Sequence, residues 1–181
     1  MKKFILIILL LIFLPTYSVF GSSDIATQSS SMQNEKINYE LPYPGILPDN
    51  PLYILKVARD KAVSFLISDP FKKAEFDLLV SDKRLNAALF LMNNKKDALS
   101  VSTIAKSNNY FHEAVGKLID AKKDGKDINS LAEKMKISLK KHNEVLKSIE
   151  KEIDSKYKEE LLYEEKRLGE IASYLESATT P

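Results

Sequence analysis

The sequence contains no cysteine and no tryptophan, and it has only 5 glycines among its 181 residues. Without cysteine the chain forms no disulfide framework, thiolate nucleophile, cysteine zinc site or iron–sulfur cluster. It also lacks the cysteine that carries lipid in a bacterial lipoprotein. The glycines form no phosphate-cradling loop, and no G-x-S-x-G elbow is present. What is there, 44% hydrophobic and 29% charged residues, is typical of one globular domain with short appendages.

The first segment has the organisation of a secretory signal. A positive start, Met1 to Lys3, precedes an unbroken apolar run from Phe4 to Leu14. The run is shorter than the roughly 20 residues of a transmembrane helix. Val19 and Gly21 fit the −3 and −1 positions of a cleavage site, so residues 1–21 are predicted to be a signal peptide. An uncleaved anchor is the alternative, and both place the rest of the chain outside the cytoplasm.

The charge balance gives no reason to expect a nucleic acid partner. The precursor has 27 basic and 25 acidic residues, and removal of the leader takes away two lysines and balances the two. The lysines between 134 and 151 are interleaved with glutamates and resemble an ordinary solvated face, with attraction to an anionic wall polymer or lipid as the alternative. Membrane contact is otherwise expected only through an uncleaved leader.

A linker and an extended arm precede the helical part. Residues 22–40 are rich in Ser, Gln, Asn and Thr and are predicted to be a disordered linker. The segment from Tyr39 to Pro51 contains four prolines among apolar residues. It is predicted to dock on the core as an extended arm. The helical domain is expected over 41–178.

Local signals divide the remaining chain into helices. Asn50-Pro51 and Asp69-Pro70 each combine an N-cap side chain with a proline at the first helical position. Apolar residues then recur every three or four positions. This predicts five helices: one over 51–67, a second ending at Asn93-Asn94, a third from Asp97 to Gly125, a fourth starting at Asp127 or Asn129, and a fifth after a break at Asp154-Ser155.

The predicted fold class is all-α. Four long helices joined by short connections favour an antiparallel up-and-down four-helix bundle, with the shorter helix 51–67 packed on its side or end. Gly116 and Gly169 lie inside helices and are interpreted as points of close helix–helix approach. Because residues 128–177 contain no proline, a single long rod over this range is the alternative.

Two segments resemble a known family. L-P-D-N-P-L-Y-I-L-K from Leu47 and D-P-F-K-K-A-E-F-D-L-L-V-S-D-K-R-L-N-A-A from Asp69 are similar to an uncharacterised, domain-of-unknown-function family of bacterial extracytoplasmic helical domains. The segment K-H-N-E-V-L from Lys141 is also similar to that family. The resemblance covers roughly 42–175 and implies an exported helical module without a known activity. The family's usual proline before the last helix is replaced here by Asp154-Ser155.

One polar layer is the candidate site. His112 and His142 lie at or beside apolar faces, and folding back about the predicted turns places Asp82 and Glu165 near the same height. This predicts a divalent metal site made of His112, His142, Glu165 and Asp82. The alternative is a hydrogen-bonded structural layer in which Arg84 or Arg167 neutralises the acids. A pH-sensitive layer is a further alternative.

The sequence therefore favours a non-enzymatic exported module that binds a protein or cell-envelope partner through a bundle face. An extracytoplasmic metal-binding protein that uses the polar layer is the second hypothesis. No cofactor is expected apart from that divalent metal, and no catalytic residue is predicted. The E-x-x-H pairs of di-iron bundles are absent, since Asn109 and Leu139 precede the two histidines at the required spacing.

Overall fold

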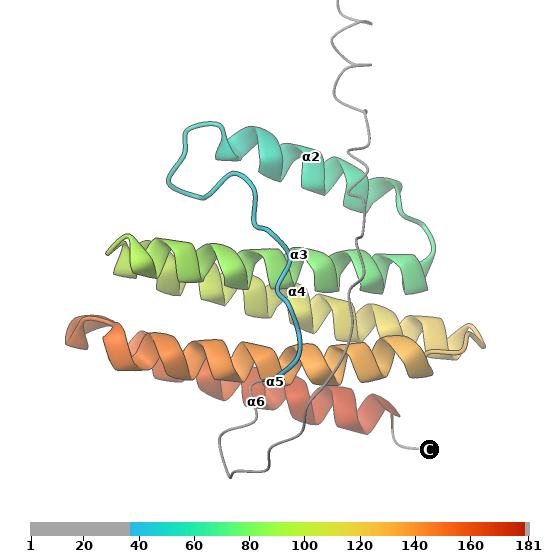
Figure 1. Ribbon diagram of the computed structural model, residues 1–181. Coiled ribbons are helices and arrows are strands. Elements are labelled where there is room, and N and C mark those ends of the chain that lie inside the picture. Colours follow the sequence, from blue (N-terminus) through green and yellow to red (C-terminus); the bar gives the residue numbers. More distant parts are fainter. Residues whose placement is uncertain (1–36, 180–181) are drawn as a thin grey trace, which may run out of the picture. The chain divides into compact units, whose positions relative to one another are not determined.

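The computed structural model describes residues 37–179, and their regular secondary structure is helical (Figure 1). The predicted leader and most of the predicted linker lie outside these residues. The elements are α2 (Tyr53–Leu66), α3 (Pro70–Asn93), α4 (Asp97–Lys123), α5 (Asn129–Glu152), the 3-10 turn η1 (Ser155–Tyr157) and α6 (Lys158–Thr179). The predicted all-α fold is confirmed. None of the helices in this described part is both long and apolar enough to cross a bilayer.

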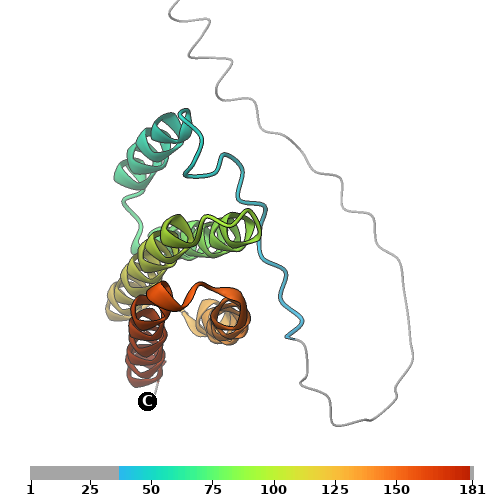
Figure 2. The same cartoon turned by 90° about the vertical axis from the view of Figure 1, so that its left-hand side faces the viewer.

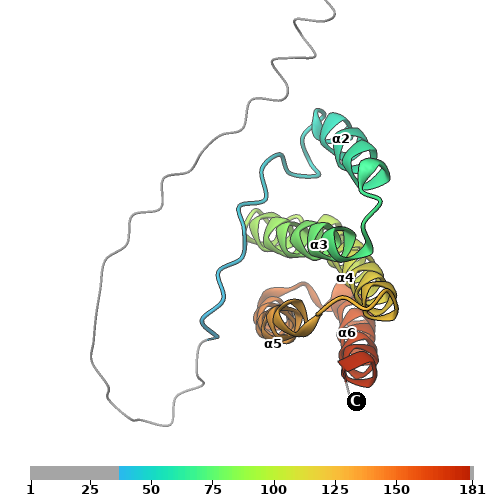
Figure 3. The same cartoon turned by 90° about the vertical axis from the view of Figure 1, so that its right-hand side faces the viewer.

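Helices α3 to α6 form the expected four-helix bundle, with α2 as the additional helix. Both α3 and α6 pack against α4 and α5, so α4 and α5 lie across a diagonal (Figure 3). The connection between α4 and α5 therefore crosses one end of the bundle. The core lies between the four helices, and its largest fully buried side chains include Leu78, Leu85, Phe111, Leu118, Met135, Leu146 and Leu161.

The predicted start of α3 and the predicted breaks after α4 and α5 are confirmed, whereas α2 begins at Tyr53, two residues after the predicted start at Pro51. The Asp69 side chain accepts bonds from the backbone N–H groups of Phe71 and Lys72, which caps α3. Gly125 has a φ of 77°, the left-handed conformation that follows many helix ends. After Glu152 the backbone becomes extended at Ile153, so the single rod over 128–177 is wrong.

The interpretation of Gly116 and Gly169 as close-approach points is also wrong. A Cβ atom built on either residue meets nothing within 4 Å. Both glycines lie inside regular helices, where glycine lowers stability because it has the most backbone freedom to lose on folding. Neither position needs glycine for packing.

Gly116→Ala and Gly169→Ala are therefore expected to raise the free energy of unfolding by about 0.5–1 kcal/mol each. Urea unfolding followed by circular dichroism measures this change. Gly125→Ala is the matched control and is expected to destabilise, because Gly125 has a positive φ. Destabilisation by either helix variant would show that the open space at these positions is needed.

The extended arm docks on the bundle as predicted, and its first anchored residue precedes the expected domain boundary at residue 41. The backbone N–H of Ile37 donates to Glu144 Oε2 at 3.2 Å. Asn86 Nδ2 donates to the carbonyl of Pro42 at 3.0 Å. Leu41 packs against the hydrophobic core. The arm thereby links α5 to α3 before the chain turns into α2.

Helix α2 differs most from the sequence-based expectation. It lies on the side of α3 that faces away from α6 (Figure 2). Its apolar stripe is turned outward and consists of Leu52, Leu55, Ala58, Ala62, Phe65 and Leu66. Leu55, Phe65 and Leu66 are 67%, 87% and 75% exposed, whereas Asp60 is the one buried residue of the helix. The expectation that this stripe packs on the bundle is wrong.

Polar contacts explain this orientation of α2. Arg84 Nη1 on α3 donates to the Tyr53 hydroxyl at 2.7 Å, and Lys56 Nζ donates to the carbonyl of Pro44 in the arm at 2.6 Å. Both Tyr53 and Lys56 lie on the helix side opposite the apolar stripe. These bonds hold the polar side of α2 toward α3 and the arm.

Candidate functional site

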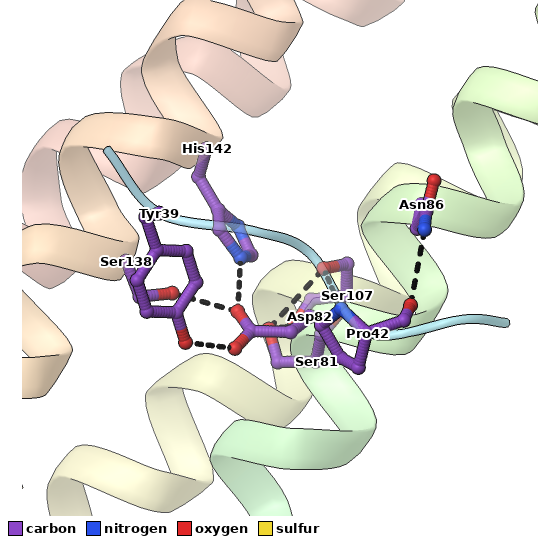
Figure 4. A network of polar contacts seen from close by, with 8 residues as sticks. All are labelled: Tyr39, Pro42, Ser81, Asp82, Asn86, Ser107, Ser138 and His142. Carbon is purple, nitrogen blue, oxygen red and sulfur yellow. Dashed lines mark hydrogen bonds and ion pairs between the residues drawn. The ribbon is translucent and has the colours of Figure 1, made fainter. Parts of the chain in front are cut away.

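Asp82 is the centre of a buried polar network between α3, α5 and the arm. Its Oδ1 accepts a hydrogen bond from Ser138 Oγ at 2.6 Å and lies 2.9 Å from His142 Nε2. Its Oδ2 accepts a bond from the Tyr39 hydroxyl at 2.5 Å. Figure 4 shows the three side chains converging on the carboxylate. Because a carboxylate only accepts, the Nε2–H of His142 is the donor.

The surroundings of His142 fix the orientation of its ring. The side chain is fully buried, and its ring lies edge-on to Phe111 with 5.1 Å between centroids. Its Nδ1 atom has no hydrogen-bond partner. With Nε2 directed at Asp82 and Nδ1 buried, His142 acts as a single donor to the carboxylate.

Burial and the nearby Asp82 carboxylate raise the pKa of the Tyr39 hydroxyl above its usual range. Tyr39 therefore remains a neutral donor at any physiological pH. The network consists of three donors and one shared acceptor, and it joins the arm to two helices of the bundle. Such an arrangement fixes the register of these elements.

The structure does not place His112 in this network. His112 is exposed on α4, and its ring stacks on Tyr174 with 5.3 Å between centroids and 22° between planes. The sequence-based placement of the two histidines assumed that α4 and α5 pack side by side. They lie across the bundle diagonal, and Phe111 rather than His112 faces His142.

Glu165 is also outside the network. It lines a surface cleft with Lys140 and Asn143, and burial together with the charge of Glu150 raises its pKa. Of the four predicted metal ligands, Asp82 and His142 are brought together and His112 and Glu165 are not. Within residues 37–179 no group of three or more His, Asp and Glu side chains is placed to hold a metal ion.

Further polar side chains extend the layer through the bundle. The hydroxyl of Ser81 donates to the backbone carbonyl of Ser107 at 2.9 Å, and the hydroxyl of Ser107 donates to the backbone carbonyl of Ser81 at 2.8 Å (Figure 4). Arg167 Nη1 pairs with Glu164 Oε2 at 2.9 Å, and Asn108 Nδ2 donates to the same oxygen. Arg167 thus neutralises Glu164 in this layer, whereas Arg84 makes no ion pair with these acids.

Asp77 is a buried acid outside these bonds. It is 1% exposed, and its Oδ1 has no hydrogen-bond partner. Burial, assisted by repulsion from Glu113, raises its pKa to about 6, although Lys73 and Lys117 oppose the shift. The acid lies on α3, one turn before Ser81.

Sequence reasoning missed Tyr39 and Ser138 as partners of Asp82. Tyr39 begins the proline-rich apolar segment, and nothing in the sequence indicates where its hydroxyl lies. Ser138 precedes His142 by four positions and therefore shares its helix face. That spacing was the available signal.

The network within the described residues thus consists of hydrogen bonds to the Asp82 carboxylate. No curated protein and no solved structure matches the chain. A family model, described as a domain of unknown function (DUF5667), matches residues 45–172, from the arm to α6. Because this match covers well over half of the chain, the protein belongs to the DUF5667 family.

Proposed function

We propose that the protein is an exported, non-enzymatic helical module that binds a cell-envelope partner, and that this partner is an anionic lipid surface. The outward apolar stripe of α2 carries the proposal. Isolated exposed apolar residues are common on soluble proteins, but a continuous stripe on one helix marks an interaction site. Export is supported by the charged start and the apolar run at the beginning of the sequence.

The charges beside the stripe support a lipid surface. At 100° per residue, Arg59 lies along one edge of the stripe and Lys61 along the other. An amphipathic helix with apolar residues on one face and cations at its edges lies in the headgroup region of anionic membranes. The acid of this helix, Asp60, is buried and bonded to Arg59 rather than presented outward.

A second copy of the chain is a less suitable partner. A two-fold axis between antiparallel copies of α2 sets each edge of the stripe against the same edge of its partner. Arg59 would then face Arg59 and Lys61 would face Lys61. An anionic surface attracts Lys61 and the exposed guanidinium of Arg59, which Asp60 already pairs on one side, whereas a second copy sets like charges together.

Sedimentation with lipid vesicles tests the proposal. The exported protein, with its N-terminus determined by mass, is expected to bind phosphatidylglycerol vesicles, to bind neutral phosphatidylcholine vesicles more weakly, and to be released by salt. The double variant Leu55→Ser/Phe65→Ser is expected to lose at least about tenfold in affinity, because two apolar side chains leave the interface.

Ile137→Ser/Leu162→Ser is the matched control, since these residues are 41% and 49% exposed on α5 and α6. It is expected to bind the vesicles like the unchanged protein. Equal binding by the α2 variant would contradict the proposal. A dimer that fails to bind vesicles and is dissociated by the α2 substitutions would show that the stripe pairs with a second copy.

A further inference from the structure

Arg84 is a buried cation without an acidic partner. Arg84 is 7% exposed, and its guanidinium makes no ion pair within residues 37–179. Nη1 donates to the Tyr53 hydroxyl, the guanidinium carbon lies 4.7 Å from the centroid of the Tyr110 ring, and Nε is buried with no acceptor. Buried charges are normally paired, because an unpaired one loses its hydration without compensation.

A cleft of about 300 Å³ lies beside this guanidinium, between α2 and α3. Its charged lining consists of Lys56, Arg59, Lys83, Arg84 and Asp60. The acid Asp60 is already bonded by its neighbour Arg59 at 2.7 Å. The cleft therefore has an excess of positive charge that no described side chain neutralises.

The environment of Lys56 reflects this excess. Burial lowers the pKa of its ammonium group, and the nearby charges of Arg84, Lys83 and Arg59 lower it further, against the attraction of Asp60. Lys56 Nζ also donates to two backbone carbonyls of the arm, those of Pro44 and Ile46. An anion between α2 and α3 would relieve the repulsion among these cations.

We infer that the cleft between α2 and α3 binds the phosphate group of an anionic ligand. An arginine N–H edge matches phosphate oxygens, and lysines at the rim add charge. The rest of the lining is apolar, with Val63, Phe76 and Leu79, which suits an alkyl group attached to the phosphate. The inference does not depend on the lipid surface proposed above, because Lys56, Lys83 and Arg84 are outside the apolar stripe. Arg59 alone lies both at the edge of the stripe and in the lining of the cleft.

Isothermal titration with two probes tests the inference. These are inorganic phosphate and dihexanoyl phosphatidic acid below its micelle concentration. The protein is expected to bind one phosphate group per chain. Arg84→Met is expected to weaken binding at least about tenfold, because a charge-assisted bond is lost. Lys106→Met is the control, because it removes an exposed cation from α4 and changes the net charge by the same amount as Arg84→Met. It should bind the probes within about twofold of the unchanged protein.

Melting temperatures separate ligand binding from a structural role of Arg84. Without a probe, Arg84→Met should melt close to the unchanged protein, because the cost of burying the cation is removed together with its contacts to Tyr53 and Tyr110. With a probe, only the unchanged protein should gain stability. If Arg84→Met fails to fold, Lys83→Met replaces it in the experiment. Lys83 is half-buried at the cleft, and its replacement is expected to weaken binding several-fold.

The two probes distinguish the source of the phosphate. Tighter binding of the phosphatidic acid, reduced by Leu79→Ser, would identify a lipid headgroup, since Leu79 contributes apolar lining. Equal binding of both probes would identify free phosphate. Failure of both to bind, or binding unchanged in Arg84→Met and Lys83→Met, would overturn the inference. Because both probes are soluble, these results are independent of the vesicle experiment.

Discussion

Replacing Asp82 with alanine is expected to lower the free energy of unfolding by about 3–5 kcal/mol. The carboxylate accepts bonds from Ser138, His142 and Tyr39, and it is 2% exposed. Its removal leaves buried donors without an acceptor, and each such donor costs about 1–3 kcal/mol. Partial relaxation and water entry keep the total below the sum. Chemical unfolding followed by circular dichroism measures the change.

Two other variants give the scale for Asp82→Ala. Asp124→Ala removes an exposed acid at the end of α4 and should change stability by less than about 0.5 kcal/mol. Tyr39→Phe removes one donor and leaves Asp82 with two, so a loss of about 1 kcal/mol is expected. A loss below 1 kcal/mol for Asp82→Ala would contradict the role of the carboxylate as the shared acceptor.

Asp77→Asn is expected to stabilise the protein at pH 8 by about 2–3 kcal/mol. The pKa of Asp77 is about 6 in the folded protein against an ordinary value of 3.8, so the folded state binds this proton more tightly than the unfolded state does. Charged Asp77 therefore destabilises the fold above pH 6, and the penalty disappears as the pH falls toward 4. An asparagine has no charge to bury at either pH.

The difference between Asp77→Asn and the unchanged protein, measured by urea unfolding from pH 4 to pH 8, isolates this group from other acids. It should be near zero at pH 4 and largest at pH 8. Glu75→Gln, an exposed acid on the same helix, is the control and should show little pH-dependent difference. A less stable Asp77→Asn at pH 8 would mean that attraction to Lys73 and Lys117 outweighs the effect of burial.

Local signals predicted the elements well because each depends on neighbours in the chain. Asp69-Pro70, Gly125 and the break after Glu152 act through backbone bonds or dihedral angles within a few residues. The orientation of α2 depends instead on distant contacts. Tyr53 bonds Arg84 across 31 positions, and that contact reverses the face suggested by the apolar stripe.

Of the four residues predicted to form the polar site, Asp82 and His142 are neighbours in the structure, whereas His112 and Glu165 are not part of it. Asp82 and His142 interrupt apolar stripes, and buried polar side chains of this kind form hydrogen bonds with one another. The position of His112 depended on which helices are neighbours, and a short connection fixes antiparallel direction but not adjacency. The diagonal placement of α4 and α5 turned His112 to solvent. The unneutralised Arg84 had no sequence signal, since its expected acid partners lie elsewhere.

The way the arm is fastened has a mechanical consequence. Its first described residues run across the bundle and are held by the Ile37 N–H bond to Glu144 and the Tyr39 hydroxyl bond to Asp82. Tension applied to the chain from the N-terminal side would load these two bonds before any helix. The force would therefore act on the same carboxylate that aligns α3 with α5. The arm would detach only when the alignment of these two helices is disturbed.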